Sequence, residues 1–139
     1  MGIIHRKESV EHIDTNIIIR LIVRDNKEQL EKIRKLFSYK EKLYVFDDSA
    51  MMEVVFVLSG KIYQYPREKI AAKIKSIFEL PNLVCNKSII EGALDIYVEH
   101  PKLSFVDCYL AVVTEASGET PLWTLDHKLA GNSKVAKVL

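Results

Sequence analysis

Residues 43–60 read LYVFDDSAMMEVVFVLSG, and this stretch carries the pattern that decides the fold. It begins with a short apolar run, residues 43–46, which is typical of a buried strand. The next three residues, 47–49, are two aspartates and a serine, which are good caps for a helix. The helix predicted over residues 50–59 stops at Gly60, a residue type that commonly ends helices. A buried strand followed at once by a helix indicates an α/β protein.

The same alternation continues along the chain in both directions. We predict strands at residues 10–13, 43–46, 83–85, 122–125 and 135–139, and helices at residues 16–24, 27–39, 50–59, 66–78, 87–98, 105–116 and 127–130. Strands that alternate with helices form a mostly parallel sheet covered on both faces. The predicted fold is therefore a three-layer α/β/α sandwich around a mostly parallel sheet of about five strands.

Length and composition favour one globular domain. The chain has 139 residues, of which 48% are apolar and 28% charged, and these values exclude a disordered chain. We expect a single domain over residues 1–139, with residues 1–9 as an N-terminal extension. The net charge is only +1, so a nucleic-acid partner would have to be held by local basic patches.

The sequence predicts a cytoplasmic protein without a membrane segment. Its apolar stretches are shorter than the roughly 18 residues that span a bilayer. The N-terminus, MGIIHRKESVEH, carries charges where a signal peptide needs an apolar region. Cys85 and Cys108 stand alone, as expected of reduced cytosolic thiols.

Four acidic residues occupy unusual places. Glu53 and Asp107 each lie inside a helix whose neighbouring residues are apolar on nearly all sides, where an ionised carboxylate is costly unless it is paired or bound to a metal. Asp14 and Asp126 each follow a predicted strand, so both belong at the carboxyl edge of the sheet. Asp107 reaches the same edge if the fourth strand starts there and runs back antiparallel.

Each acid alone also has an ordinary explanation. Asp14 or Asp126 would serve as a helix cap, and Glu53 or Asp107 as a buried acid satisfied by amides or an arginine. Four such acids at one edge favour a shared cation instead. A site of carboxylates without histidine or cysteine suits Mg²⁺ or Mn²⁺, the ions that assist phosphodiester hydrolysis. The sequence leaves open whether one or two ions bind.

At these residues the chain resembles the PIN-domain nucleases, in particular the VapC toxins of bacterial and archaeal toxin–antitoxin pairs. The resemblance is carried, in order, by IDTNIIIRL (13–21), MEVVFVL (52–58), FVDCYLA (105–111) and WTLDHKL (123–129). It implies a Mg²⁺- or Mn²⁺-dependent endoribonuclease that forms a homodimer and is blocked by a small antitoxin.

The resemblance also implies roles for individual residues. The four acids of the family fall on Asp14, Glu53, Asp107 and Asp126, which would be the catalytic and metal-binding residues. Supporting polar residues fall on Thr15, Asn16 and Thr124.

Basic residues near these acids are candidates for holding RNA phosphates, namely Arg20, Arg24 and Lys128, although each could equally be a solvated surface charge. His127 is a possible general acid, but an exposed or capping role is the simpler reading.

Two alternatives stay open at this point. A receiver-like phospho-acceptor domain shares the length, the α/β order and an acidic pocket, although the acid pair 47–48 follows the second strand and Cys85-Asn86 stands where its acceptor aspartate belongs. A PIN-like scaffold that binds RNA or protein without cleavage is the other.

Overall fold

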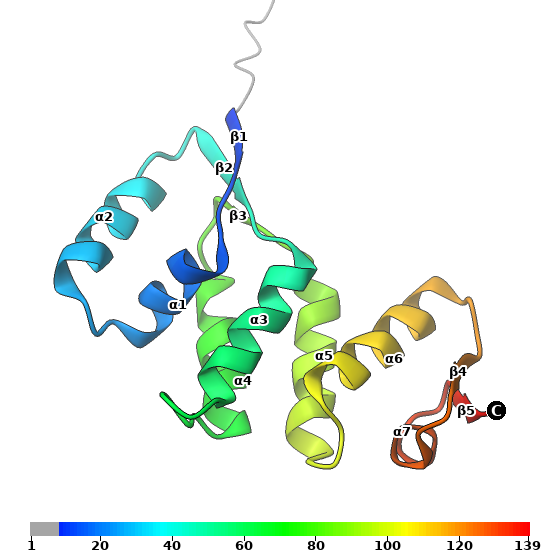
Figure 1. The fold of residues 1–139 in the computed structure, drawn as a ribbon. Helices are drawn as coiled ribbons and strands as arrows, with labels where there is room; N and C mark the ends of the chain where they lie inside the picture. Colours follow the sequence, from blue (N-terminus) through cyan, green and yellow to red (C-terminus); the bar gives the residue numbers. More distant parts are fainter. Residues whose placement is uncertain (1–8) are drawn as a thin grey trace, which may run out of the picture.

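The computed structural model describes residues 9–139, so the expected N-terminal extension lies outside the described residues except for Ser9, which begins the first strand. The elements, in chain order, are β1 (Ser9–His12), α1 (Thr15–Val23), α2 (Lys27–Phe37), β2 (Lys42–Val45), α3 (Asp48–Ser59), α4 (Arg67–Ile77), β3 (Leu83–Val84), α5 (Lys87–Glu99), α6 (Phe105–Ser117), β4 (Leu122–Thr124), α7 (His127–Asn132) and β5 (Ala136–Val138) (Figure 1). Each predicted element is found within a few residues of its expected ends, which confirms the α/β class.

The strands form two sheets rather than the single sheet that we expected. One sheet has the order β1-β2-β3, and the other consists of β4 and β5. Every pairing is parallel, as predicted for most of the sheet. The antiparallel return expected of the fourth strand is not seen, because β4 pairs in parallel with β5 and with no other strand of residues 9–139.

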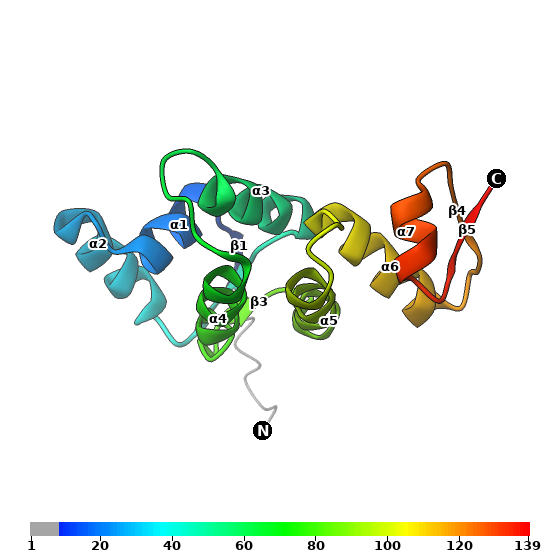
Figure 2. The ribbon, with the colours of Figure 1, turned by 90° about the horizontal axis from the view of Figure 1, so that it is seen from below.

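The helices pack in layers around the three-stranded sheet. Viewed from below, α1 and α3 lie on one side and α4 and α5 on the other (Figure 2). The core between them is made of aliphatic side chains that are fully buried, among them Ile18, Val54, Leu58, Ile70, Ile74, Ile90 and Leu94. The periodic apolar residues of each helix face this core, which is why the helices form where the sequence pattern predicts them.

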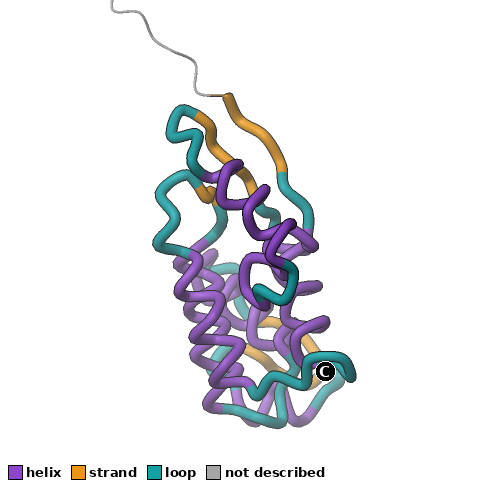
Figure 3. The backbone as a smooth tube through the Cα atoms, turned by 90° about the vertical axis from the view of Figure 1, so that its left-hand side faces the viewer, coloured by secondary structure: helices purple, strands orange, loops and turns teal. Residues whose placement is uncertain are grey.

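Strands β4 and β5 and helix α7 make up what we call the C-terminal unit, residues 122–138. Leu129 and Ala136 of this unit are buried, and α6 joins it to the rest of the molecule. Figures 1 and 2 show the unit beyond α6, away from β1, β2 and β3. In Figure 3 the three strands of the first sheet gather at one end, while the second pair lies elsewhere behind the helices.

Within residues 9–139, no helix is both long and apolar enough to cross a bilayer.

Candidate metal centre

Asp14 lies where β1 gives way to α1, at the carboxyl end of the first sheet. It is the N-cap of α1, and its Oδ1 accepts a 3.0 Å hydrogen bond from the backbone N–H of Asn16. The side chain is exposed. The ordinary explanation for this aspartate is therefore realised, yet the cap occupies only one of its two carboxylate oxygens.

Glu53 contacts Thr15, the residue that directly follows Asp14 in the chain. The hydroxyl of Thr15, a buried side chain at the start of α1, donates a 3.1 Å hydrogen bond to Oε2 of Glu53. This contact joins the helix that follows β1 to the helix that follows β2. The side chain of Asn16 is exposed beside Thr15. The supporting roles of Thr15 and Asn16 in a metal site stay predictions.

The expectation that Glu53 is buried is wrong, because Glu53 is exposed and Asp107 is only half-buried. The apolar residues around them do not all face the core. Phe56 of α3 is 77% exposed, and Val106 and Leu110 of α6 are 49% and 40% exposed. The helices that carry these acids are apolar on nearly all sides because part of their apolar surface is uncovered, and not because the acids are completely buried.

Asp107 lies in the first turn of α6 and takes part in a capping box. Its backbone N–H donates to Oγ of Ser104 at 3.1 Å, and its Oδ2 accepts from the N–H of Ser104 at 3.3 Å. Because α6 packs against α3, Asp107 and Glu53 lie on neighbouring helices.

Asp126 is the N-cap of α7 and belongs to the C-terminal unit. Its Oδ1 accepts a 2.8 Å hydrogen bond from the N–H of Lys128, and its own N–H donates to Oγ1 of Thr124 at 2.9 Å. Thr124 therefore holds the backbone that carries Asp126, while its supporting role in a metal site stays a prediction. His127 is exposed.

The four predicted acids do not come together within one chain. No three histidine, cysteine or carboxylate side chains of residues 9–139 are grouped so that they could hold a metal ion. Asp14, Glu53 and Asp107 stand on adjoining elements, whereas Asp126 is carried away with the C-terminal unit. The donor chemistry suits a hard divalent cation, since every candidate ligand is a carboxylate. However, too few of these carboxylates are grouped within one copy to hold such a cation.

One further acidic residue, Asp48, joins two helices and was not singled out from the sequence. Asp48, in the first turn of α3, accepts a hydrogen bond from the hydroxyl of Tyr109 and another, at 3.3 Å, from Nδ2 of Asn86. The hydrogen bond that Tyr109 donates to Asp48, with burial as the second cause, raises the pKa of Tyr109 to about 12. This cluster ties α6 to the carboxyl ends of β2 and β3. The acid pair after β2 was the available signal, but its pattern indicates a helix cap and was otherwise considered only for a receiver-like domain.

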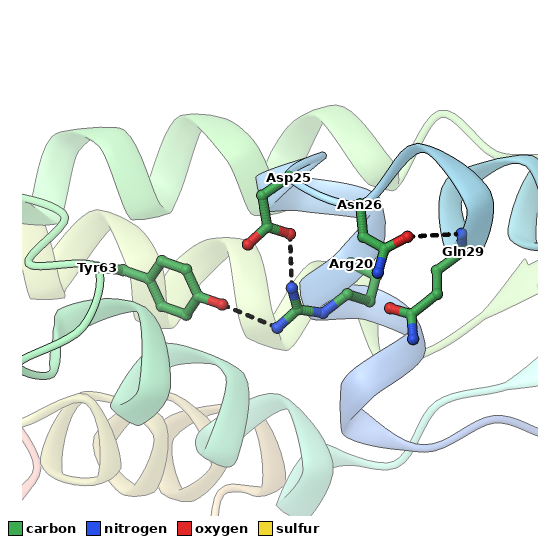
Figure 4. Close-up of polar contacts among 5 residues, drawn as sticks. All are labelled: Arg20, Asp25, Asn26, Gln29 and Tyr63. Atoms are coloured by element: carbon green, nitrogen blue, oxygen red, sulfur yellow. Dashed lines mark hydrogen bonds and ion pairs between the residues drawn. The ribbon is translucent and has the colours of Figure 1, made fainter.

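The candidate phosphate-binding residues differ in their surroundings. Figure 4 shows that the guanidinium of Arg20 is shared between Asp25, at 2.5 Å, and the hydroxyl of Tyr63, at 2.8 Å. Burial lowers the pKa of Arg20, but the hydrogen bonds with Asp25 and Tyr63 outweigh it and raise that pKa overall. Arg24 and Lys128 are exposed.

The fold and the acids define a class, the α/β proteins that bind ligands at the carboxyl ends of their parallel strands. Comparison with family models makes the class specific, because the PIN domain model matches residues 12–135. The chain therefore belongs to the PIN domain family. PIN domains are generally nucleases that use divalent metal ions, which supports a hydrolase acting on nucleic acid. Neither the curated proteins nor the solved structures gave a match.

Proposed function

We propose that this chain is a Mg²⁺- or Mn²⁺-dependent endoribonuclease, and that it is the VapC-type toxin of a toxin–antitoxin pair acting in the cytoplasm. The observation that carries the proposal is the hydrogen bond from Thr15 to Glu53. It orients a carboxylate from α3 toward the start of α1, beside Asp14, in a chain that belongs to a family of nucleases.

The proposed roles are those that the resemblance implies, and no three of these acids are grouped within residues 9–139 of one copy. Asp14, Glu53 and Asp107 would hold the cation, and Asp126 would complete the site. A bound divalent ion would supply a hydroxide near neutral pH and neutralise charge on the scissile phosphate. Thr15 holds the Glu53 carboxylate in place, and Thr124 holds the turn that carries Asp126.

Basic and apolar surfaces support the proposed partners. Arg24 and Lys128 are exposed and could contact the phosphates of a bound RNA, whereas Arg20 would have to share its guanidinium with Asp25. Phe56 and Val106 line a mainly apolar groove between α3 and α6, the two helices that carry Glu53 and Asp107. This uncovered apolar groove is the surface that we assign to a small antitoxin.

The test is cleavage of a panel of structured and single-stranded RNAs with Mn²⁺, Mg²⁺ or EDTA. The wild type should cut at least one RNA with metal and none with EDTA. Asp14→Asn should lose cleavage by about 10²-fold or more, since a metal ligand is removed. The matched control is Asp95→Asn, which loses only an exposed ion pair with Lys75 and should cut normally.

Two outcomes would contradict the proposal. Equal cleavage by the wild type and Asp14→Asn would take Asp14 out of the site. RNA binding without cleavage under any metal condition would instead favour a scaffold that holds RNA. The toxin role has its own readout, since induced expression of the wild type, and not of Asp14→Asn, should arrest bacterial growth.

A further inference from the structure

Within residues 9–139, four strands have one unpaired edge, namely β1, β3, β4 and β5. Two of them, β1 and β4, lead into the predicted acids Asp14 and Asp126. Among residues 9–139, β1 pairs only with β2, and β4 pairs only with β5. Each therefore presents a row of backbone N–H and C=O groups that can accept another strand. Figures 1 and 2 show the two edges well apart, with α6 between them, so they do not satisfy each other within the chain.

Apolar side chains are exposed on the same two strands. Val10 of β1 is 60% exposed, and Trp123 of β4 is 59% exposed. Leu125, directly after β4, is 77% exposed. A monomer that stays in water usually protects such edges with charges, proline or a covering element. Side chains of a strand stand on the faces of its sheet, so Val10 and Trp123 mark apolar sheet faces beside these two edges that residues 9–139 leave uncovered.

We propose that two copies of this chain exchange their C-terminal units. In this dimer, β4 of one copy adds in parallel to the free edge of β1 of the second copy, and the second copy does the same in return. Each half then contains a five-stranded parallel sheet in the order β3-β2-β1-β4-β5. The exchange is reciprocal and closes under two-fold symmetry, as most homodimers do.

The exchange also completes the acidic site. In the first sheet, His12 is opposite Val45, so that Asp14 and Asp47 both lie two residues beyond the strand ends. Asp126 likewise lies two residues beyond Thr124, the last residue of β4. Parallel pairing that aligns His12 with Thr124 brings Asp126 of the partner subunit beside Asp14. The fourth acid, which is missing from the site in one copy, would thus come from the other.

The packing of α6 is the reason to assign a second copy rather than closure within one chain. Phe105, Cys108 and Ala111 of α6 are buried, and the hydrogen bond from Tyr109 to Asp48 anchors the second turn of the helix. These contacts hold the first turns of α6 against the rest of the molecule. Beyond α6, β4 lies apart from the β1 of its own chain, so the free edge of β1 is open to the β4 of a second copy.

A disulfide test reports this exchange independently of any nuclease activity. The alignment of His12 with Thr124 places Glu11 opposite Trp123, so both are replaced by cysteine in a Cys85→Ser, Cys108→Ala background. Oxidation of Glu11→Cys/Trp123→Cys should give a covalent dimer of two 16.0 kDa chains on non-reducing gels. Each single cysteine variant serves as the control and should stay mainly a single chain.

Two results would overturn the exchange. A disulfide closed within one chain, seen as a faster-running monomer, would show that β4 returns to its own β1. A monomer by light scattering at micromolar concentration, with no disulfide formed, would show that neither edge takes another strand.

The contribution of Asp126 across the dimer rests on the proposed function and has a separate test. Asp14→Asn and Asp126→Asn are unfolded together, refolded and compared with each variant alone. In an exchanged dimer, each mixed pair has one site with both changes and one intact site, so about a quarter of all sites should regain Mn²⁺ binding measured by calorimetry. No regain, together with a positive disulfide test, would leave the dimer intact and remove Asp126 from the metal site.

Discussion

Oγ1 of Thr15 lies 3.1 Å from Oε2 of Glu53, across the contact between α1 and α3. Thr15 is buried and Glu53 is exposed, so the hydroxyl holds one oxygen of a carboxylate that would otherwise rotate freely in water. Groups that orient metal-binding carboxylates are worth about 10- to 100-fold in metal affinity or activity. We therefore propose Thr15 as a positioning residue for Glu53.

The first prediction concerns this hydroxyl. Thr15→Val keeps the shape and removes the donor, so RNA cleavage at a fixed Mn²⁺ concentration should fall about 10-fold or more. Thr15→Ser keeps the donor and should retain most of the activity. The measurement is initial cleavage rate against Mn²⁺ concentration, with the thermal midpoint of each variant as the check on folding. Equal rates for the two variants at equal stability would show that the hydrogen bond does not matter to the site.

The second prediction concerns the hydrogen bond from Tyr109 to Asp48. Tyr109→Phe removes it and should lower the free energy of unfolding by about 1–2 kcal/mol at pH 7, since the acceptor is charged and the pair is partly buried. Urea unfolding of both proteins measures this difference. A loss below about 0.3 kcal/mol would show that the contact contributes little to holding α6 against α3.

The same pair gives a pH dependence with a definite sign. The pKa of Tyr109 is about 12 in the folded chain against an ordinary 10.0, so the folded state holds this proton more tightly. The stabilisation is complete below pH 10 and disappears as the pH rises toward about 12. The difference in stability between the wild type and Tyr109→Phe should therefore shrink over that range. A difference that stays constant up to pH 12 would contradict the raised pKa.

The elements were predictable because the local patterns agree with the final packing. The capping box of Ser104 and Asp107, the cap at Asp14 and the αL glycine at Gly118 set helix ends that the sequence shows directly. Sheet assembly was not predictable in this way. β4 lies beyond α6, apart from β1, and pairs with β5 instead, an arrangement of whole elements that no local pattern encodes.

The site was predictable in its residue types and less so in its environment. The apolar surroundings of Glu53 suggested burial because periodicity reports which residues are apolar but does not report what covers them. Phe56 and Val106 are apolar and exposed, so the same pattern arises at a surface that another chain can cover. Asp48 was missed as a partner of Tyr109 because 61 residues separate them in the sequence.

The third prediction concerns Asn82, a buried amide next to β3. Its Nδ2 donates to the backbone carbonyls of Phe37 at 3.1 Å and Tyr39 at 3.3 Å, which fixes the end of α2 against β3. Asn82→Ala should lower the free energy of unfolding by about 1–3 kcal/mol, because both carbonyls lose a donor in a buried place. Urea unfolding provides the measurement.

The matched control is Asn132→Ala, which removes an exposed hydrogen bond to the carbonyl of Lys128 and should change stability by less than about 0.5 kcal/mol. Comparable losses at the two positions would mean that burial at Asn82 carries no extra weight.

The fourth prediction concerns Gln64, an exposed residue in the connection between α3 and α4. Its φ of 51° lies in the left-handed region, which is unfavourable for a residue with a Cβ by about 1–2 kcal/mol. Its backbone N–H donates a 2.8 Å hydrogen bond to the carbonyl of Gly60, so the turn keeps this conformation in the folded state. Gln64→Gly removes the steric conflict but gives the unfolded chain more freedom, and the two effects oppose each other. The free energy of unfolding should rise by about 0.5–1 kcal/mol, measured by thermal and urea unfolding.

The control is Gln29→Gly, which replaces an exposed glutamine of α2. It should lower the free energy of unfolding by about 0.5–1 kcal/mol, because glycine is less favourable than glutamine in a helical conformation. Opposite signs at the two glutamines would establish that the backbone conformation at Gln64, rather than loss of a side chain, sets the change, whereas a loss at both would show that the turn relaxes without strain.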